Sequence, residues 1–198
     1  MINIAITDAE RADELLGALS DQLQAGGSSY DLVVVGGTAL LALGLTDRAT
    51  RDVDLVAIRD GDALVAAKPL PEDLVAARNR VARDFGLPPE WLNDGPASLL
   101  DFDLPQGFLD RVSRRTYGPA LSVSFASRID QIHFKLYAMV DQGPGKHEQD
   151  LQAMNPTPEE LLAAARWSRT HDPSEGHLEM LRQALTHLGV QDADLGAA

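Results

Sequence analysis

Apolar residues recur along the chain with two different periods, and their alternation predicts a mixed α/β fold. Residues 8–25 follow the helical period of 3.6 and predict an amphipathic helix, with Thr7 or Asp8 as its N-terminal cap and the sequence Gly26-Gly27-Ser28-Ser29 as its end. Two short runs rich in β-branched residues, 31–35 and 52–58, have the pattern of buried strands. A helix-forming run, 38–43, lies between them. This order predicts a strand, a short helix and a second strand near the N-terminus.

The middle of the chain predicts one helix and one strand, separated by irregular structure. Residues 71–86 have helical periodicity and end at a Gly-Leu-Pro-Pro sequence. Residues 91–108 are interrupted by proline and glycine, which predicts short turns. Residues 121–125 alternate between apolar and polar side chains, a pattern typical of a half-buried strand.

The last third of the chain predicts helices only. Ser127 is a candidate cap for a helix that runs to about Asp141. Its predicted inward-facing residues are Ile129, Ile132, Leu136, Met139 and Val140. Thr157-Pro158-Glu159-Glu160 has the signature of a capping box with proline at the first helical position, and a final helix is predicted over about 174–188. We therefore expect a small mixed sheet flanked by helices in residues 1–126, and a helical region, 127–198, packed on this core.

Composition fits a folded protein of 198 residues. Hydrophobic residues make up 44% of the chain and charged residues 24%, which excludes wholesale disorder and fibrous repeats. The absence of cysteine excludes disulfides, thiolate zinc sites and cysteine nucleophiles. The first residues lack the pattern of a secretion signal and no run of 18 apolar residues occurs, so we expect a soluble, cytoplasmic protein without a membrane partner.

The balance of charge is acidic but uneven. The formal net charge is −13, so the molecule as a whole should repel nucleic acid. Residues 110–147, however, contain six basic and three acidic side chains, a local charge of +3. This segment predicts either a local basic groove for a triphosphate or RNA, or a set of scattered ion pairs.

Candidate chemistry is concentrated in two neighbouring sequences. Gly36-Gly37-Thr38 lies where the first predicted strand turns into a helix, and Thr50-Arg51-Asp52-Val53-Asp54 begins the second strand. Residues two apart in a strand point to one face, with Cα atoms roughly 6–7 Å apart, so the two carboxylates can converge on a divalent cation. Glycines permit close approach of the backbone to a phosphate. The alternatives are a tight turn for the glycines, and for Arg51 a surface charge or a partner for Asp52.

These residues resemble the signature of the polymerase-beta-type nucleotidyltransferases, in the minimal branch of the AbiEii-like (abortive-infection type E) toxins of toxin–antitoxin systems. The match consists of Gly-Gly on the turn, Thr50 two residues before the first aspartate, and the Asp-x-Asp pair. The sequences around Lys135 and Asp150 resemble two later elements of that branch, so the likeness spans about residues 32–151.

The resemblance implies a nucleotidyltransferase fold and Mg²⁺-dependent transfer of a nucleotidyl group from an NTP to a hydroxyl of a macromolecule, with release of pyrophosphate. It implies metal ligation by Asp52 and Asp54. Nucleotide binding would fall to Gly36, Gly37, Thr38, Thr50 and Arg51. Lys135 would neutralise the triphosphate, and Asp150 would complete the acidic set or help to deprotonate the acceptor. The acceptor would be tRNA or a protein, and a cognate antitoxin would be a further partner.

Other interpretations stay open at this point. The resemblance implies a third carboxylate on a later strand, whereas the predicted strand 121–125 has none, and Asp101 and Asp103 form a second Asp-x-Asp in a turn-rich segment. Lys135 has the alternative of reaching to solvent beside an apolar stripe, and Asp150 that of a helix N-cap. The five histidines have no metal-ligand spacing. A degenerate fold that binds nucleotide or a protein partner without turnover, as an antitoxin-like or regulatory module, is the second hypothesis.

Overall fold

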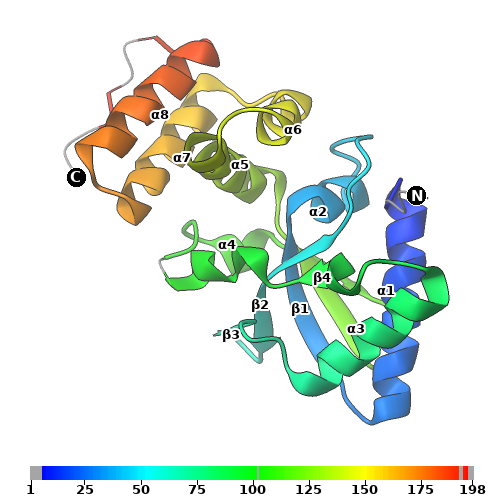
Figure 1. Cartoon of the computed structure of the whole chain (residues 1–198). Coiled ribbons are helices and arrows are strands. Elements are labelled where there is room, and N and C mark those ends of the chain that lie inside the picture. Colours follow the sequence, from blue (N-terminus) through cyan, green and yellow to red (C-terminus); the bar gives the residue numbers. More distant parts are fainter. Residues whose placement is uncertain (1–5, 102, 192–193, 196–198) are drawn as a thin grey trace. The chain divides into compact units, whose positions relative to one another are not determined.

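The computed structural model describes residues 6–101, 103–191 and 194–195. The chain forms two compact units, Met1–Ala126 and Ser127–Ala198 (Figure 1). The elements of the first unit, in chain order, are α1 (Ala9–Gly26), β1 (Tyr30–Val35), α2 (Gly36–Ala42), β2 (Val53–Asp60), β3 (Ala63–Ala66), α3 (Glu72–Phe85), the 3₁₀ helix η1 (Pro89–Trp91), β4 (Leu92–Asn93), the 3₁₀ helix η2 (Gly95–Asp101), α4 (Phe108–Arg111), β5 (Ser113–Thr116) and β6 (Leu121–Phe125).

The six strands of the first unit form one mixed sheet. Their order is β3-β2-β1-β6-β5. The short strand β4 also pairs with β2, at residues 53–54, whereas β3 pairs with residues 57–60 of β2. The pairs β1–β6 and β2–β4 are parallel, and the other pairs are antiparallel. This arrangement confirms the predicted α/β class with a small mixed sheet flanked by helices, and it is consistent with a nucleotidyltransferase fold.

One face of the sheet is covered by α1 and α3, which pack against each other (Figure 1). Leucines of α1 at helical spacing are fully buried there, and Leu74 and Val81 of α3 join them. The predicted caps of α1 are present, because the Asp8 side chain accepts from the Arg11 N–H and Gly27 ends the helix in the left-handed conformation.

The alternation of side chains along β1 and β2 decides which residues reach the opposite face. Leu32 and Val34 of β1 belong to the core beneath α1 and α3. Val35 therefore points to the other face, and the register places it opposite Asp54 of β2. The carboxylate of Asp54 is thus on the sheet face that α1 and α3 leave uncovered.

Three strands of the sheet were not predicted, and the reason differs among them. β4 has two residues, β5 has the polar sequence Ser-Arg-Arg-Thr, and β3 is a mostly exposed edge strand. β6 was predicted as a half-buried strand, but it is more buried than this, since four of its five residues are buried.

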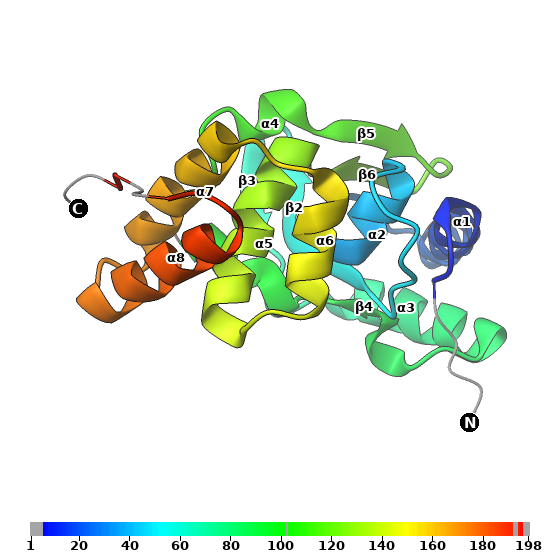
Figure 2. The same ribbon diagram turned by 90° about the horizontal axis from the view of Figure 1, so that it is seen from above.

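The second unit is helical, as predicted. It contains α5 (Arg128–Gln142), α6 (Lys146–Met154), α7 (Pro158–His171) and α8 (Glu175–His187). Figure 2 shows α5 between α6 and α7, and α8 contacts both α5 and α7. Ser127 caps α5, and Thr157 with Glu160 forms the predicted capping box of α7. The prediction that Ile129 faces inward was wrong: its side chain is 42% exposed, in the first turn of α5.

None of the helices in the described part of the chain is long and apolar enough to span a membrane.

The buried His177 of the second unit should make the free energy of unfolding fall in acid. His177 of α8 is buried, and its Nε2 lies 2.9 Å from the Ser168 hydroxyl. Burial lowers the pKa of His177 below the ordinary 6.5, although the carboxylates of Asp172 and Asp141 oppose the shift.

The folded state therefore binds this proton less readily than the unfolded state, and the free energy of unfolding falls as pH drops below 6.5. Urea unfolding at pH 7.5 and at pH 5.5 should show a smaller loss of stability for His177→Gln than for the wild type. Equal losses in the two proteins would contradict this assignment.

Candidate active site

The site begins where β1 ends and α2 starts without an intervening loop. Gly36, the first residue of α2, has a φ of 76°, a conformation that side chains with a Cβ rarely adopt. A Cβ on Gly36 would overlap the Oδ2 atom of Asp54. The turn therefore requires glycine for two independent reasons, and it lies directly against the Asp54 carboxylate.

Gly37 makes an equally close approach to the segment before β2. A Cβ at this position would lie 2.6 Å from Thr50 Oγ1 and 2.8 Å from Thr50 Cβ. Thr50 is itself fixed by a pair of backbone hydrogen bonds with Ile6, and its hydroxyl donates to Asp52 Oδ1 at 3.3 Å. The two glycines thus bring α2 into contact with Thr50 and Asp54.

Thr38 completes the link between α2 and the aspartates. Its side chain is fully buried, and its hydroxyl donates to the backbone carbonyl of Asp52 at 2.7 Å. This contact makes Thr38 a residue that holds the two segments together. Arg51 is exposed on the segment before β2.

The aspartate pair supplies oxygen ligands of the kind that Mg²⁺ prefers. Asp52 immediately precedes β2, Asp54 is its second residue, and both side chains are partly exposed. Within the described residues, no group of three or more His, Cys, Asp or Glu side chains has a metal-binding arrangement. Asp101, at the end of η2, and Asp103 are exposed. The donor set fits a cation that takes its remaining ligands from water or substrate phosphates.

Asn93 is a member of the site that the sequence did not reveal. It lies opposite Asp54 in the parallel pairing of β4 with β2, and its Nδ2 donates to Asp54 Oδ1 at 3.1 Å. A two-residue strand has no periodicity to read, so no pattern could mark Asn93. The sequence does place a tryptophan, Trp91, two positions before Asn93. A large aromatic residue is usually buried, and Trp91 is buried here and anchors this segment.

In the second unit, Lys135 of α5 and Asp150 of α6 bind each other. Their Nζ and Oδ2 atoms are 2.7 Å apart, and the side chains are 8% and 0% exposed. The alternatives of a solvent-reaching lysine and of an N-cap aspartate were both wrong, because Lys135 is buried and Asp150 lies inside α6. The pair is an internal ion pair of this unit.

The basic segment 110–147 supplies ion pairs. Four of its six basic side chains pair with carboxylates: Arg114 with Asp31, Arg115 with Asp13, Arg128 with Glu160, and Lys135 with Asp150. This neutralisation favours the interpretation of scattered ion pairs over that of a basic groove.

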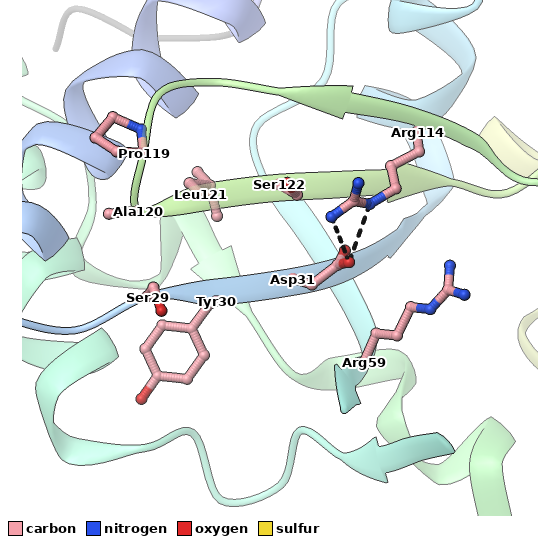
Figure 3. A pocket seen from close by; sticks show the side chains of 9 residues that line it. All are labelled: Ser29, Tyr30, Asp31, Arg59, Arg114, Pro119, Ala120, Leu121 and Ser122. Carbon is pink, nitrogen blue, oxygen red and sulfur yellow. Dashed lines mark hydrogen bonds and ion pairs between the residues drawn. The ribbon is translucent and has the colours of Figure 1, made fainter. Parts of the chain in front are cut away.

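A cavity of about 320 Å³ lies near the opposite end of β1 from the aspartate pair (Figure 3). Arg59 and Arg114 line it, and Arg114 Nε and Nη2 each lie 3.0 Å from Asp31 Oδ2. Asp31 thus neutralises Arg114, and the cavity is lined by none of the residues predicted to bind metal or nucleotide or to act in catalysis.

Comparison with known families connects this geometry to a class of reaction. Residues 13–153 match the family described as "Nucleotidyltransferase of unknown function (DUF6036)". The chain belongs to this nucleotidyltransferase family. The match includes the glycine turn, both aspartates, Asn93, Lys135 and Asp150. Searches of curated proteins and of solved structures gave no match.

The glycine turn of this nucleotidyltransferase can be tested against a glycine elsewhere in the first unit. Gly36→Ala should destabilise the protein by about 1–3 kcal/mol, because the new methyl group overlaps Asp54 and the backbone is left-handed. Gly17→Ala is the matched control, since nothing lies within 4 Å of its Cβ position in α1. The control should gain about 0.5–1 kcal/mol of stability in chemical denaturation. Equal effects of the two substitutions would contradict the packing described.

The internal ion pair of the second unit predicts strongly non-additive mutations. Lys135→Met should cost about 3–5 kcal/mol, because it leaves the Asp150 carboxylate buried without its cation. The double variant Lys135→Met/Asp150→Asn should recover most of this loss, since neither charge remains. Urea unfolding of Lys135→Met, Asp150→Asn and the double variant measures the coupling between the two side chains. A loss in the double variant equal to the sum of the two single losses would refute this coupling.

Proposed function

We propose that this chain is a Mg²⁺-dependent nucleotidyltransferase that transfers a nucleotidyl group from an NTP to a hydroxyl of a macromolecule. The observation that carries the proposal is the packing of the glycine turn against Asp54, together with the hydroxyl contacts that fix Asp52. A turn packed this closely against Thr50 and the partly exposed carboxylate of Asp54 has no simple packing explanation.

Asp52 and Asp54 are the proposed metal ligands, and a bound Mg²⁺ would neutralise charge on the triphosphate and polarise the α-phosphate. Gly36 and Gly37 would let the β- and γ-phosphates approach the backbone closely. Thr38 and Thr50 would act by holding the turn and Asp52 in place, as their hydrogen bonds favour. Arg51, exposed beside Asp52, would contact the nucleotide as a counter-charge.

In the proposed reaction, the acceptor oxygen forms a bond to the α-phosphorus as the bond from that phosphorus to the bridging oxygen breaks. Pyrophosphate leaves with the bridging oxygen, and the hydroxyl proton passes to solvent water. Lys135 and Asp150 form an ion pair in the second unit. Their roles stay predictions from the family resemblance: Lys135 would neutralise the triphosphate, and Asp150 would complete the acidic set or help to deprotonate the acceptor.

The acceptor and the biological role rest on the likeness of the motifs to those of AbiEii-like toxins. We propose tRNA as the acceptor, and growth inhibition relieved by a cognate antitoxin as the role. A net charge of −13 disfavours body-wide contact with RNA, so recognition would be confined to the end that carries the hydroxyl.

A second candidate function is nucleotide or partner binding without turnover. Two observations favour it. The side chain that contacts Asp54 from the neighbouring strand is the amide of Asn93, and among the described residues no third carboxylate joins Asp52 and Asp54. A site with two carboxylates binds a cation more weakly than one with three.

A transfer assay separates the two functions: the protein is incubated with labelled NTP, Mg²⁺ and total tRNA, and the label transferred to the acceptor is measured. Asp54→Ala should reduce label transfer by about a thousandfold, because loss of a metal ligand removes several kcal/mol of transition-state stabilisation. Asp60→Asn, an exposed position at the end of the same strand, is the matched control and should retain wild-type transfer.

Tight binding of Mg²⁺–NTP without transfer to tRNA or protein would overturn the enzymatic proposal in favour of the binding module. Transfer to protein with none to tRNA would retain the nucleotidyltransferase and reject the proposed acceptor.

A further inference from the structure

Asn93 is held in one orientation by two hydrogen bonds. Its Oδ1 accepts the Gly95 N–H at 2.9 Å, so its Nδ2 is turned toward Asp54, where it donates to Oδ1 at 3.1 Å. An amide has one acceptor end and one donor end, and the Gly95 contact fixes which end faces the carboxylate.

The strand that carries Asn93 is anchored on the side away from the site. The indole Nε1 of the buried Trp91 donates to the Arg78 carbonyl at 3.1 Å, and the Arg78 guanidinium donates to the Leu92 carbonyl at 3.2 Å. These contacts tie β4 to α3, and the pairing of Leu92 with Val53 sets its register. The two-residue strand is thereby placed with Asn93 opposite Asp54.

The two oxygens of Asp54 consequently have different surroundings. Oδ1 accepts from Asn93, whereas Oδ2 lies against Gly36 at the glycine turn. A carboxylate fixed at one oxygen cannot rotate freely, so its other oxygen is presented in a constant direction.

We propose that Asn93 is a positioning residue that orients the Asp54 carboxylate for a divalent cation, and that its neutral amide keeps cation binding weak until a nucleotide arrives. This inference rests on the metal site of the proposed function. The charge argument is direct: Asp52 and Asp54 contribute two negative charges, and affinity for hard cations rises with the number of charged ligands. A nucleotide would add the negative charge of its phosphates.

The test is binding of Mn²⁺ without nucleotide, followed by electron paramagnetic resonance on the full chain. Asn93→Ala should weaken binding about tenfold to a hundredfold, the usual effect of removing a partner that orients a metal ligand. Asn93→Asp keeps the acceptor for Gly95, and hence the loop, but places a third carboxylate beside Asp54. It should strengthen binding at least about tenfold.

Gln24→Ala, which removes an exposed amide side chain from α1, is the matched control and should bind Mn²⁺ as the wild type does. Thermal unfolding of each variant shows whether the fold is retained, and Asn93→Asp carries the test if Asn93→Ala does not fold. Wild-type Mn²⁺ affinity in a folded Asn93→Ala variant overturns the positioning role of Asn93. Wild-type affinity in Asn93→Asp overturns the claim that the neutral amide keeps cation binding weak.

Asp54→Ala in the same titration separates this inference from the proposed function. If Asp54→Ala abolishes Mn²⁺ binding while both Asn93 variants bind as the wild type does, the inference fails and the metal site stands. If Asp54→Ala binds Mn²⁺ as well as the wild type does, the metal site fails and the inference fails with it.

Discussion

The close packing of Gly36 and Gly37 against the strand that carries the aspartates is the constraint on which the site depends. A side chain at either glycine would collide with Asp54 or Thr50. Because α2 begins directly after β1, the turn and the aspartate pair occupy adjacent strands without a flexible connection. Thr38 and Thr50 add hydrogen bonds to Asp52 from both segments, so the carboxylates are held by rigid elements.

The sheet gives this constraint its location. Burial of Leu32 and Val34 beneath α1 and α3 fixes the rotation of β1, and the register of β2 then turns Asp54 to the opposite face. The same face carries Asp31 of β1, four residues before Val35, and the Asp31 carboxylate neutralises Arg114. Arg59 and Arg114 line the cavity beside Asp31, near the opposite end of β1 from the glycine turn.

Much of this was accessible from the sequence because it depends on local rules. Periodicity and capping chemistry predict the longer helices α1, α3, α5, α7 and α8, the caps at Asp8, Ser127 and Thr157, and the first two strands. The conjunction of Gly36-Gly37 with Asp52 and Asp54 also indicated the reaction class to which the family belongs. What could not be predicted depends on long-range pairing. Asn93 meets Asp54 only through a two-residue strand, and Lys135 meets Asp150 only through the packing of two helices.

A crystal structure of the full chain with Mn²⁺ and a non-hydrolysable NTP analogue tests the account most directly, because the anomalous signal of manganese locates the cation independently of the protein. The account predicts an anomalous peak within ligand distance of both Asp52 and Asp54, about 2.0–2.2 Å, with the triphosphate beside Gly36 and Gly37. A triphosphate bound elsewhere, for instance between Arg59 and Arg114, with no peak at the aspartates would contradict it.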